Sequence, residues 1–166
     1  MMIGPTTAVR KVRLGWSVRR LISQIENELS DDFLILLLDA MRLALAIDPS
    51  YHQNIEHRGD IFNATYVFRS KDKGVEVTAR FEPVRILLFK RQRLRVRKGA
   101  AKRFDVEITF LNAKTLWEFL LAEDPDVFAF ILDNKLVTRG NLNYVMKFGY
   151  MANHLKSMTK LGTAAA

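Results

Sequence analysis

The stretch from Phe128 to Phe148, FAFILDNKLVTRGNLNYVMKF, decides the fold expected for this chain. It begins as an apolar helix, continues as a short strand over Lys135–Arg139, turns tightly at Gly140–Asn141 and ends in a second helix. Two apolar helices around one strand are expected to form an apolar enclosure. The stretch contains no catalytic triad, metal cluster or phosphate loop. The pattern therefore indicates binding rather than chemistry.

The rest of the chain is expected to form helices, then strands, then helices. Residues 17–47 predict a pair of helices, the second of which is apolar on nearly every side. Residues 61–111 alternate with a period of two and predict strands, with Pro83 expected to break the pattern. Residues 112–158 return to helical spacing around one strand, with Asn112 as an N-cap. This order favours an α+β fold in which helices cover one face of a largely antiparallel sheet.

The length and hydrophobic content predict one ordered domain. At 166 residues the chain can bury a sizeable core. We expect this domain over residues 17–160, between a loose arm at 1–16 and a tail at 161–166. Residues 51–60 are polar and predict an irregular segment. The longest apolar run, Phe33–Ile47, is shorter than the about 20 residues that cross a bilayer and contains Asp39 and Arg42, so it predicts a buried helix.

The chain has no cysteine, which excludes disulfides, zinc–thiolate sites and cysteine nucleophiles. This composition suits a reducing compartment. The N-terminal residues include Arg10 and Arg20 but no continuous apolar segment, so no secretory signal is predicted. They carry no acid before Glu26, a composition shared with mitochondrial transit peptides. We expect a cytoplasmic protein.

The closing helix carries a wider apolar surface than a simple surface helix needs. One side carries Leu142, Val145, Gly149 and Ala152. The adjacent side carries Tyr144, Phe148, Met151 and Leu155. Either both sides are packed, by the sheet and by a neighbouring helix or subunit, or one side packs while the second lines a lipid pocket. The residues leave both interpretations open.

Aromatic side chains on the two preceding helices would complete the walls of such a pocket. Ligand pockets are mainly apolar with few polar groups. The aromatic residues in question are Trp117, Phe119, Phe128 and Phe130. Together with Tyr144, Phe148, Met151 and Leu155 they form the candidate ligand-binding set.

The C-terminal part of the chain resembles the sterol carrier protein type-two family. The resemblance begins with Asp105–Leu111 as a strand and Trp117–Leu121 as a helix, and it continues with Ala129–Phe130 at the position of the family's Ala-Phe-like pair. The segment Lys135-Leu136-Val137-Thr138-Arg139-Gly140-Asn141 then matches the family pattern, and Leu142 with Val145–Phe148 opens the closing helix. Where the family usually has glycine before Lys-Leu, this chain has Asn134. Asparagine tolerates the left-handed conformation, so we expect the turn to survive.

This resemblance implies a five-stranded sheet covered on one side by helices, with an apolar tunnel for a sterol, a fatty acyl chain or another lipid. It implies a non-enzymatic carrier without a cofactor. Members of the family also serve as accessory proteins in isoprenoid-quinone synthesis. The strand half is more basic than expected for the family, which leaves the identity of the ligand open.

The net charge of +8 is concentrated in one segment, because every charged residue from Arg85 to Arg103 is basic. Within it, alternate positions of one strand place four arginines on one face. These are Arg91, Arg93, Arg95 and Arg97. Such a face can be the solvated side of an edge strand, a binding surface for an anionic membrane, or a contact for nucleic acid. A lipid carrier that unloads at membranes combines the second interpretation with the apolar pocket.

Two function hypotheses follow. The leading one is a lipid- or isoprenoid-binding carrier that associates peripherally with anionic membranes. The rival is a nucleic-acid-binding or scaffold protein that uses the arginine face, with the C-terminal helices serving as core or subunit contact. A metal site at His52 and His57 with Glu56 and Asp60 would require poorly spaced ligands, so no metal is expected.

Overall fold

The computed structural model describes residues 31–52, 61–86, 89–122 and 126–161. The helix expected at residues 17–29, the arm at 1–16 and the tail after 161 lie outside this part of the chain. The described helices and strands, in chain order, are α2 Asp31–Ile47, α3 Pro49–His52, β1 Ala64–Ser70, β2 Glu76–Ile86, β3 Phe89–Lys98, β4 Val106–Phe110, α4 Ala113–Leu121, α5 Val127–Leu132, β5 Leu136–Gly140 and α6 Leu142–Leu161.

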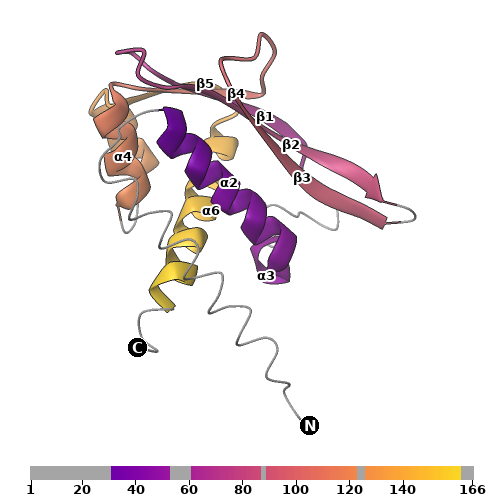
Figure 1. Cartoon of the computed structure of the whole chain (residues 1–166). Coiled ribbons are helices and arrows are strands. Elements are labelled where there is room, and N and C mark those ends of the chain that lie inside the picture. The colour runs from indigo at the N-terminus through magenta and orange to yellow at the C-terminus, as the bar shows by residue number, and fades with distance from the viewer. Residues whose placement is uncertain (1–30, 53–60, 87–88, 123–125, 162–166) are drawn as a thin grey trace.

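The five strands form one open sheet in the order β3-β2-β1-β4-β5. Strands β1 and β4 are parallel, and the other neighbours are antiparallel. The helices lie on one face of this sheet, which we call the inner face (Figure 1). The expected α+β fold, with a largely antiparallel five-stranded sheet covered on one face, is confirmed.

Alternation of apolar and polar residues explains why these segments form strands. In β2, Val77, Ala79 and Phe81 are buried on the inner face, whereas Glu76 and Arg80 are exposed on the outer face. Because side chains alternate across a strand, a single register places these three apolar residues against the helices. None of the described helices is long and apolar enough to span a membrane.

Strand β2 does not break at Pro83 as expected from the sequence. It continues to Ile86, and Pro83 pairs in register with Gln92 of β3. The last pair between β1 and β2 is Ala64 with Phe81, so at Pro83 strand β2 pairs with β3 alone. Proline is tolerated in a strand where one edge needs no hydrogen bond.

The segment after α2 was expected to be irregular from Tyr51, but its first residues form the short helix α3. Asp48 accepts a hydrogen bond from the Ser50 N–H at 2.8 Å, which is an N-cap contact. Pro49 occupies the first helical position, where its missing N–H costs nothing. Residues 53–60 of the expected irregular segment lie outside the described part of the chain.

Two of the other helices begin at polar caps. Asn112 accepts a hydrogen bond from the Thr115 N–H at 2.8 Å, which confirms it as the N-cap of α4. Asp126 accepts one from the Ala129 N–H at 3.0 Å and caps α5, which therefore begins at Val127. The Asp124-Pro125 pair is a sequence signal for a helix start, because proline suits the first helical position, but it lies outside the described residues.

The segment from Asn134 to Asn141 forms β5 between two left-handed residues. Asn134 follows α5 with φ 55°, and Gly140 ends β5 with φ 99°. The Lys135 N–H donates to the carbonyl of Phe130 at 2.9 Å and closes the helix end. Asn134 therefore adopts the left-handed conformation that glycine would provide, as the sequence predicts.

Replacing Asn134 with glycine is expected to leave the free energy of unfolding unchanged or to raise it by a few tenths of a kcal/mol, because φ 55° suits glycine. Asn134→Val is expected to lower it by about 1–2 kcal/mol, since a β-branched residue resists this conformation. Urea denaturation of the two variants measures the difference. Equal stability of the glycine and valine variants would contradict the assigned backbone conformation.

Candidate functional site

An apolar layer fills the space between the inner face of the sheet and the first half of α6. The ring of Phe148 lies 4.7 Å from that of Phe68 and 6.1 Å from that of Tyr66, both on β1. Tyr144, one turn earlier, contacts Tyr66 at 6.1 Å and the ring of Phe62 at 5.2 Å. The side of α6 that carries Tyr144 and Phe148 thus faces the sheet.

A second aromatic group lies between β4, α4 and α5. The ring of Phe119 lies 5.7 Å from that of Phe110 on β4 and 5.3 Å from that of Phe130 on α5. Phe110 and Phe119 are fully buried, while Phe130 is half-buried. This group stabilises the contact of the short helix α5 with the rest of the apolar layer.

The structure does not bring all eight predicted ligand-binding residues to one place. Trp117 is half-buried and contacts Phe33 of α2, with ring centroids 4.2 Å apart. Met151 and Leu155 are buried further along α6. Phe128 points away from the layer and is 55% exposed. The direct contact of these residues with a ligand stays a prediction.

Both predicted sides of α6 are covered. Val145, Gly149 and Ala152 are buried on one side, and Phe148 is buried on the other. The wide apolar arc read from the sequence therefore corresponds to a helix packed on two sides. The sheet covers the Phe148 side, and α2 and α4 are among the elements that contact the helix.

Two buried phenols belong to this layer and were not singled out by the sequence patterns. The Tyr66 hydroxyl donates to the Tyr144 carbonyl at 2.9 Å, and the Tyr51 hydroxyl donates to the Met151 carbonyl at 2.8 Å. Burial raises the pKa of both hydroxyl groups, so they stay neutral donors. For Tyr66, the alternation of β1 signalled burial; for Tyr51, only the fold shows it.

The outer face of the sheet is polar and rich in arginine. All four predicted residues, Arg91, Arg93, Arg95 and Arg97, are exposed on it, while Leu94 is buried on the inner face. Because β3 is an edge strand, this arrangement matches the solvated face of an edge strand. Whether it also binds an anionic partner is a separate hypothesis.

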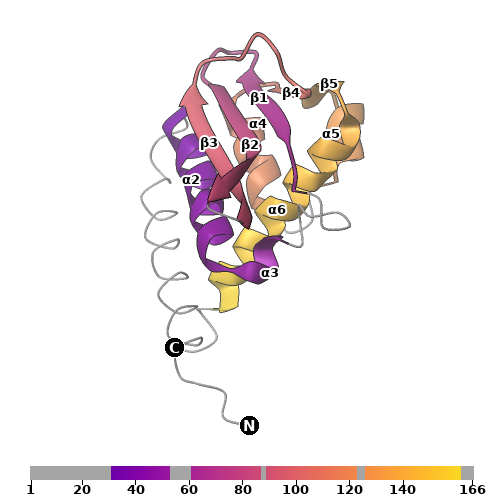
Figure 2. The same cartoon turned by 90° about the vertical axis from the view of Figure 1, so that its right-hand side faces the viewer.

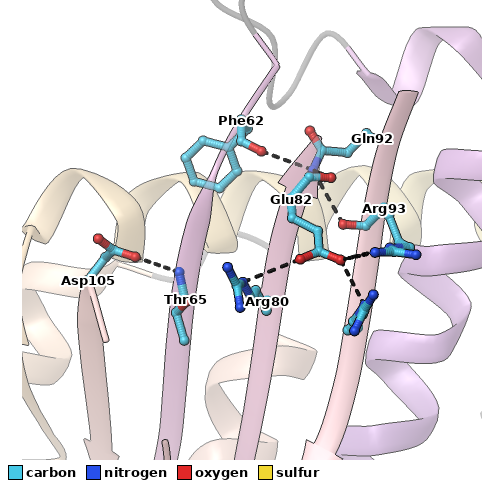
Figure 3. A network of polar contacts seen from close by, with 8 residues as sticks. Phe62, Thr65, Arg80, Glu82, Gln92, Arg93 and Asp105 are labelled. Atoms are coloured by element: carbon cyan, nitrogen blue, oxygen red, sulfur yellow. Dashed lines mark hydrogen bonds and ion pairs between the residues drawn. The ribbon is translucent and has the colours of Figure 1, made fainter. Parts of the chain in front are cut away.

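Glu82 on β2 organises part of this face, as Figure 3 shows. Its carboxylate accepts a hydrogen bond from Arg93 Nε at 2.7 Å and lies 2.7 Å from Arg95 Nε and 3.4 Å from Arg80 Nε. The glutamate side chain is 14% exposed. Three guanidinium groups from two strands therefore share one carboxylate. Sequence reasoning missed this contact because it depends on the register of β2 with β3.

The stability provided by Glu82 is expected to depend on pH. The hydrogen bond from Arg93, with the nearby charges of Arg93, Arg95 and Arg80, holds the pKa of Glu82 below its ordinary value of 4.5. A pKa lowered by folding stabilises the protein above 4.5 and loses that effect as the pH falls through the folded-state value.

Glu82→Gln is therefore expected to lower the free energy of unfolding by about 1 kcal/mol at neutral pH. The difference from wild type should shrink as the pH falls below 4.5. Glu118→Gln on α4, an exposed glutamate without an ion pair among the described residues, is the matched control. Urea unfolding of wild type and variants at a series of pH values measures the free energy of unfolding. A loss of stability in Glu82→Gln that does not change with pH would contradict the role of the carboxylate.

A second glutamate forms ion pairs with arginines on the part of the outer face made by β1, β4 and β5. Glu107 on β4 lies 3.6 Å from Arg69 Nε and 3.3 Å from Arg139 Nη1, with its side chain 7% exposed.

The residues that the structure describes contain no group of three or more His, Asp or Glu able to hold a metal ion. His57 lies outside these residues, so the weak histidine pattern is not tested.

No family model and no curated protein sequence matches the chain. Among solved structures it is similar to a stereoselective inverting sec-alkylsulfatase from Pseudomonas sp., with 15% identity and a TM-score of 0.48, covering 70% of this chain but only 15% of that enzyme. It is also similar to the sterol carrier protein domain 2 of Helicoverpa armigera, with 14% identity and a TM-score of 0.47, covering 78% of this chain and 91% of that one.

A further similarity spans most of both chains. It is to a UbiJ-SCP2 ubiquinone synthesis protein, with 16% identity and a TM-score of 0.51, covering 72% of this chain and 88% of that chain. The five-stranded sheet, the helices on one face of it and the segment from Asn134 to Asn141 agree with the family resemblance seen in the sequence. The chain adopts the fold of the sterol carrier protein type-two domains.

Proposed function

We propose that this protein binds an apolar lipid without changing it chemically, and carries it between membranes or enzymes. The observation that carries this proposal is the apolar layer between the sheet and α4, α5 and α6. Its buried phenols, Tyr51 and Tyr66, are hydrogen-bonded to backbone carbonyls and stay neutral. Such a layer offers an apolar environment to a lipid. Its two neutral phenols are not poised to act as an acid or a base.

The ligand class follows from the chemistry of the layer. Burial of each methylene contributes about 0.8 kcal/mol, so a long acyl, sterol or isoprenoid chain can bind without a specific polar contact. The similar UbiJ-SCP2 protein is named for ubiquinone synthesis. By analogy of fold, we propose an accessory role in lipid or quinone synthesis, with the protein holding an apolar intermediate.

The ligand would first contact the half-buried side chains of the predicted set, Trp117, Phe130 and Tyr144. Phe119, Phe148, Met151 and Leu155 are buried, so a ligand that reaches them must displace packed side chains. These residues are proposed as the inner wall on this basis.

Native mass spectrometry of the protein, before and after incubation with oleic acid, cholesterol and ubiquinone, tests the proposal. We expect at least one of these ligands to remain bound, and Phe130→Asp to reduce its occupancy, because a charge in the aromatic group opposes binding. Tyr150→Asp, at a 62% exposed aromatic position of α6 outside the predicted set, is the matched control. A protein that takes up none of the three ligands would refute the lipid-carrier function.

Delivery at an anionic membrane is the second part of the proposal, supported by the exposed arginines of β3. Arg91 and Arg97 form no ion pair with a described residue, so Arg91→Gln with Arg97→Gln leaves the contacts of Glu82 intact. Each basic residue near such a surface contributes about 1 kcal/mol, so the pair should weaken binding to phosphatidylglycerol vesicles about 30-fold. Lys73→Gln with Lys114→Gln removes the same charge elsewhere and should have a smaller effect.

The rival function, nucleic-acid binding or scaffolding, uses the same arginine face. Phosphate attraction would give binding that weakens steeply with salt. Binding of duplex or single-stranded DNA that is tighter than binding to phosphatidylglycerol vesicles at equal ionic strength, and that is lost in the Arg91→Gln, Arg97→Gln variant, would favour it over membrane delivery.

A further inference from the structure

The short helix α5 presents two large apolar side chains to solvent. Leu132 is 80% exposed and Phe128 is 55% exposed. They are four residues apart, so they lie on the same face of the helix. Leu132 is the most exposed large apolar side chain in the described part of the chain. Exposure of this kind marks surfaces that contact a partner or a membrane.

We call Phe128 and Leu132 the α5 patch. The turn that follows them is held to the sheet, because the Leu111 N–H at the end of β4 donates to the carbonyl of Lys135 at 2.9 Å.

The opposite side of α5 belongs to the apolar layer. Val127 is buried, and the ring of Phe130 packs on that of Phe119 at 5.3 Å. Behind Phe119 lies Phe110 of the sheet. A six-residue helix therefore carries the α5 patch on one side and the candidate ligand-binding layer on the other.

Among the described residues, the charged groups that flank α5 in the chain are two carboxylates, Asp126 and Asp133, and one ammonium group, Lys135. Lys135 Nζ lies 3.8 Å from the carboxylate of Asp133 and 5.5 Å from the ring of Phe130. Asp126 at the start of the helix is used as its cap. An apolar patch without a basic rim fits the apolar region of a bilayer and does not need anionic lipids.

The position of α5 separates it from the arginine face. Strands β3 and β5 are the two edges of the sheet, and α5 lies beside β5 (Figure 2). A bilayer docked on the outer arginine face would have the sheet between it and the apolar layer. A bilayer that contacts α5 meets the layer without that barrier.

We propose that the α5 patch inserts into the apolar region of a lipid bilayer and that the ligand enters and leaves the protein there. This inference rests on the proposed lipid-carrier function and names the surface at which exchange takes place. Insertion depends on apolar contact, so it occurs on uncharged phosphatidylcholine membranes. The arginine face can increase attraction to anionic membranes from a distance, without being the site of exchange.

A single cysteine tests insertion directly, because the chain contains none. Leu132→Cys labelled with the NBD fluorophore should show a blue shift and a rise in emission with phosphatidylcholine vesicles. Arg97→Cys, labelled in the same way on the outer face, is the control and should show neither change. An unchanged spectrum at position 132 would overturn the inference, and so would an equal change at both positions.

Transfer of cis-parinaric acid from the protein to phosphatidylcholine vesicles tests exchange. Phe128→Ser with Leu132→Ser should slow the transfer about tenfold or more, because two exposed apolar side chains no longer enter the bilayer. Leu43→Ser with Ile47→Ser on α2, both 37% exposed, is the matched control and should transfer at the wild-type rate. Wild-type transfer by the α5 variant would overturn the inference. A wild-type protein that binds no ligand would instead refute the lipid-carrier function, which native mass spectrometry detects separately.

Discussion

Replacing Gly140 with alanine is expected to lower the free energy of unfolding by at least about 3 kcal/mol, because two penalties combine. Gly140 has φ 99°, a conformation that residues with a Cβ resist. An added Cβ would lie 2.1 Å from the carbonyl oxygen of Asp105. That oxygen also accepts the Asn141 N–H at 3.2 Å, so relief of the clash moves the junction between β5 and α6.

Gly99→Ala is the matched control for this prediction. Gly99 also has a positive φ, 82°, but an added Cβ would have no atom within 4 Å. Gly99→Ala should therefore lower the free energy of unfolding by about 1 kcal/mol, which is the conformational penalty alone. Urea denaturation of both variants gives the comparison. Similar losses of stability would show that the close approach of Asp105 does not constrain position 140.

Replacing Phe148 with alanine is expected to lower the free energy of unfolding by about 3–5 kcal/mol, because it removes a fully buried ring from the centre of the apolar layer. The ring packs against Phe68 at 4.7 Å and joins α6 to β1. Phe128→Ala makes the same chemical change at a 55% exposed position and should cost less than about 1 kcal/mol.

The Phe148→Ala variant also connects stability with the proposed function. A ligand that binds the folded state alone stabilises it by about 2.7 kcal/mol at a concentration 100 times its dissociation constant. We therefore expect oleic acid to raise the melting temperature of Phe148→Ala more than that of the wild type, because the cavity left by the ring accepts part of the chain. An equal or smaller rise would show that the ligand does not reach position 148.

These contacts explain the conformation of the segment from Asn134 to Asn141. Gly140 is required by its close approach to Asp105, and Asn134 closes the end of α5 in the left-handed conformation. Asp105 in turn accepts the Thr65 N–H on its carboxylate at 2.7 Å and ties β4 to β1. The segment therefore specifies how β5 joins the sheet.

Much of the fold could be predicted because local sequence patterns act over short distances. The alternation in β2 and β3, the cap at Asn112 and the apolar pattern of α2 each depend on neighbouring residues, and each is found in the structure. The exposure of Arg91 and Arg97 on one face followed from the same alternation.

The sequence expectations and the structure differ where contacts in the fold override a local sequence signal. Pro83 was expected to end a strand, but pairing with β3 alone leaves its missing N–H without cost. Phe128 remains in the predicted ligand-binding set, but it is 55% exposed, because a short helix that packs through Phe130 turns Phe128 outward. Hydrophobicity alone does not distinguish the two sides of a helix that is apolar all round.

The sequence by itself determined the class of fold, the separation of apolar and basic surfaces and the left-handed turns around β5, because these depend on periodicity and on backbone preference. Only the tertiary structure decided that Arg80, Arg93 and Arg95 share Glu82, that Tyr51 reaches the Met151 carbonyl, and that Leu132 faces solvent. The physical reason is that these contacts depend on strand register and on helix packing, which bring together residues far apart in the chain. The segment from Phe128 to Phe148 shows both: its elements follow from its residues, and the direction of each side chain follows from the sheet that it covers.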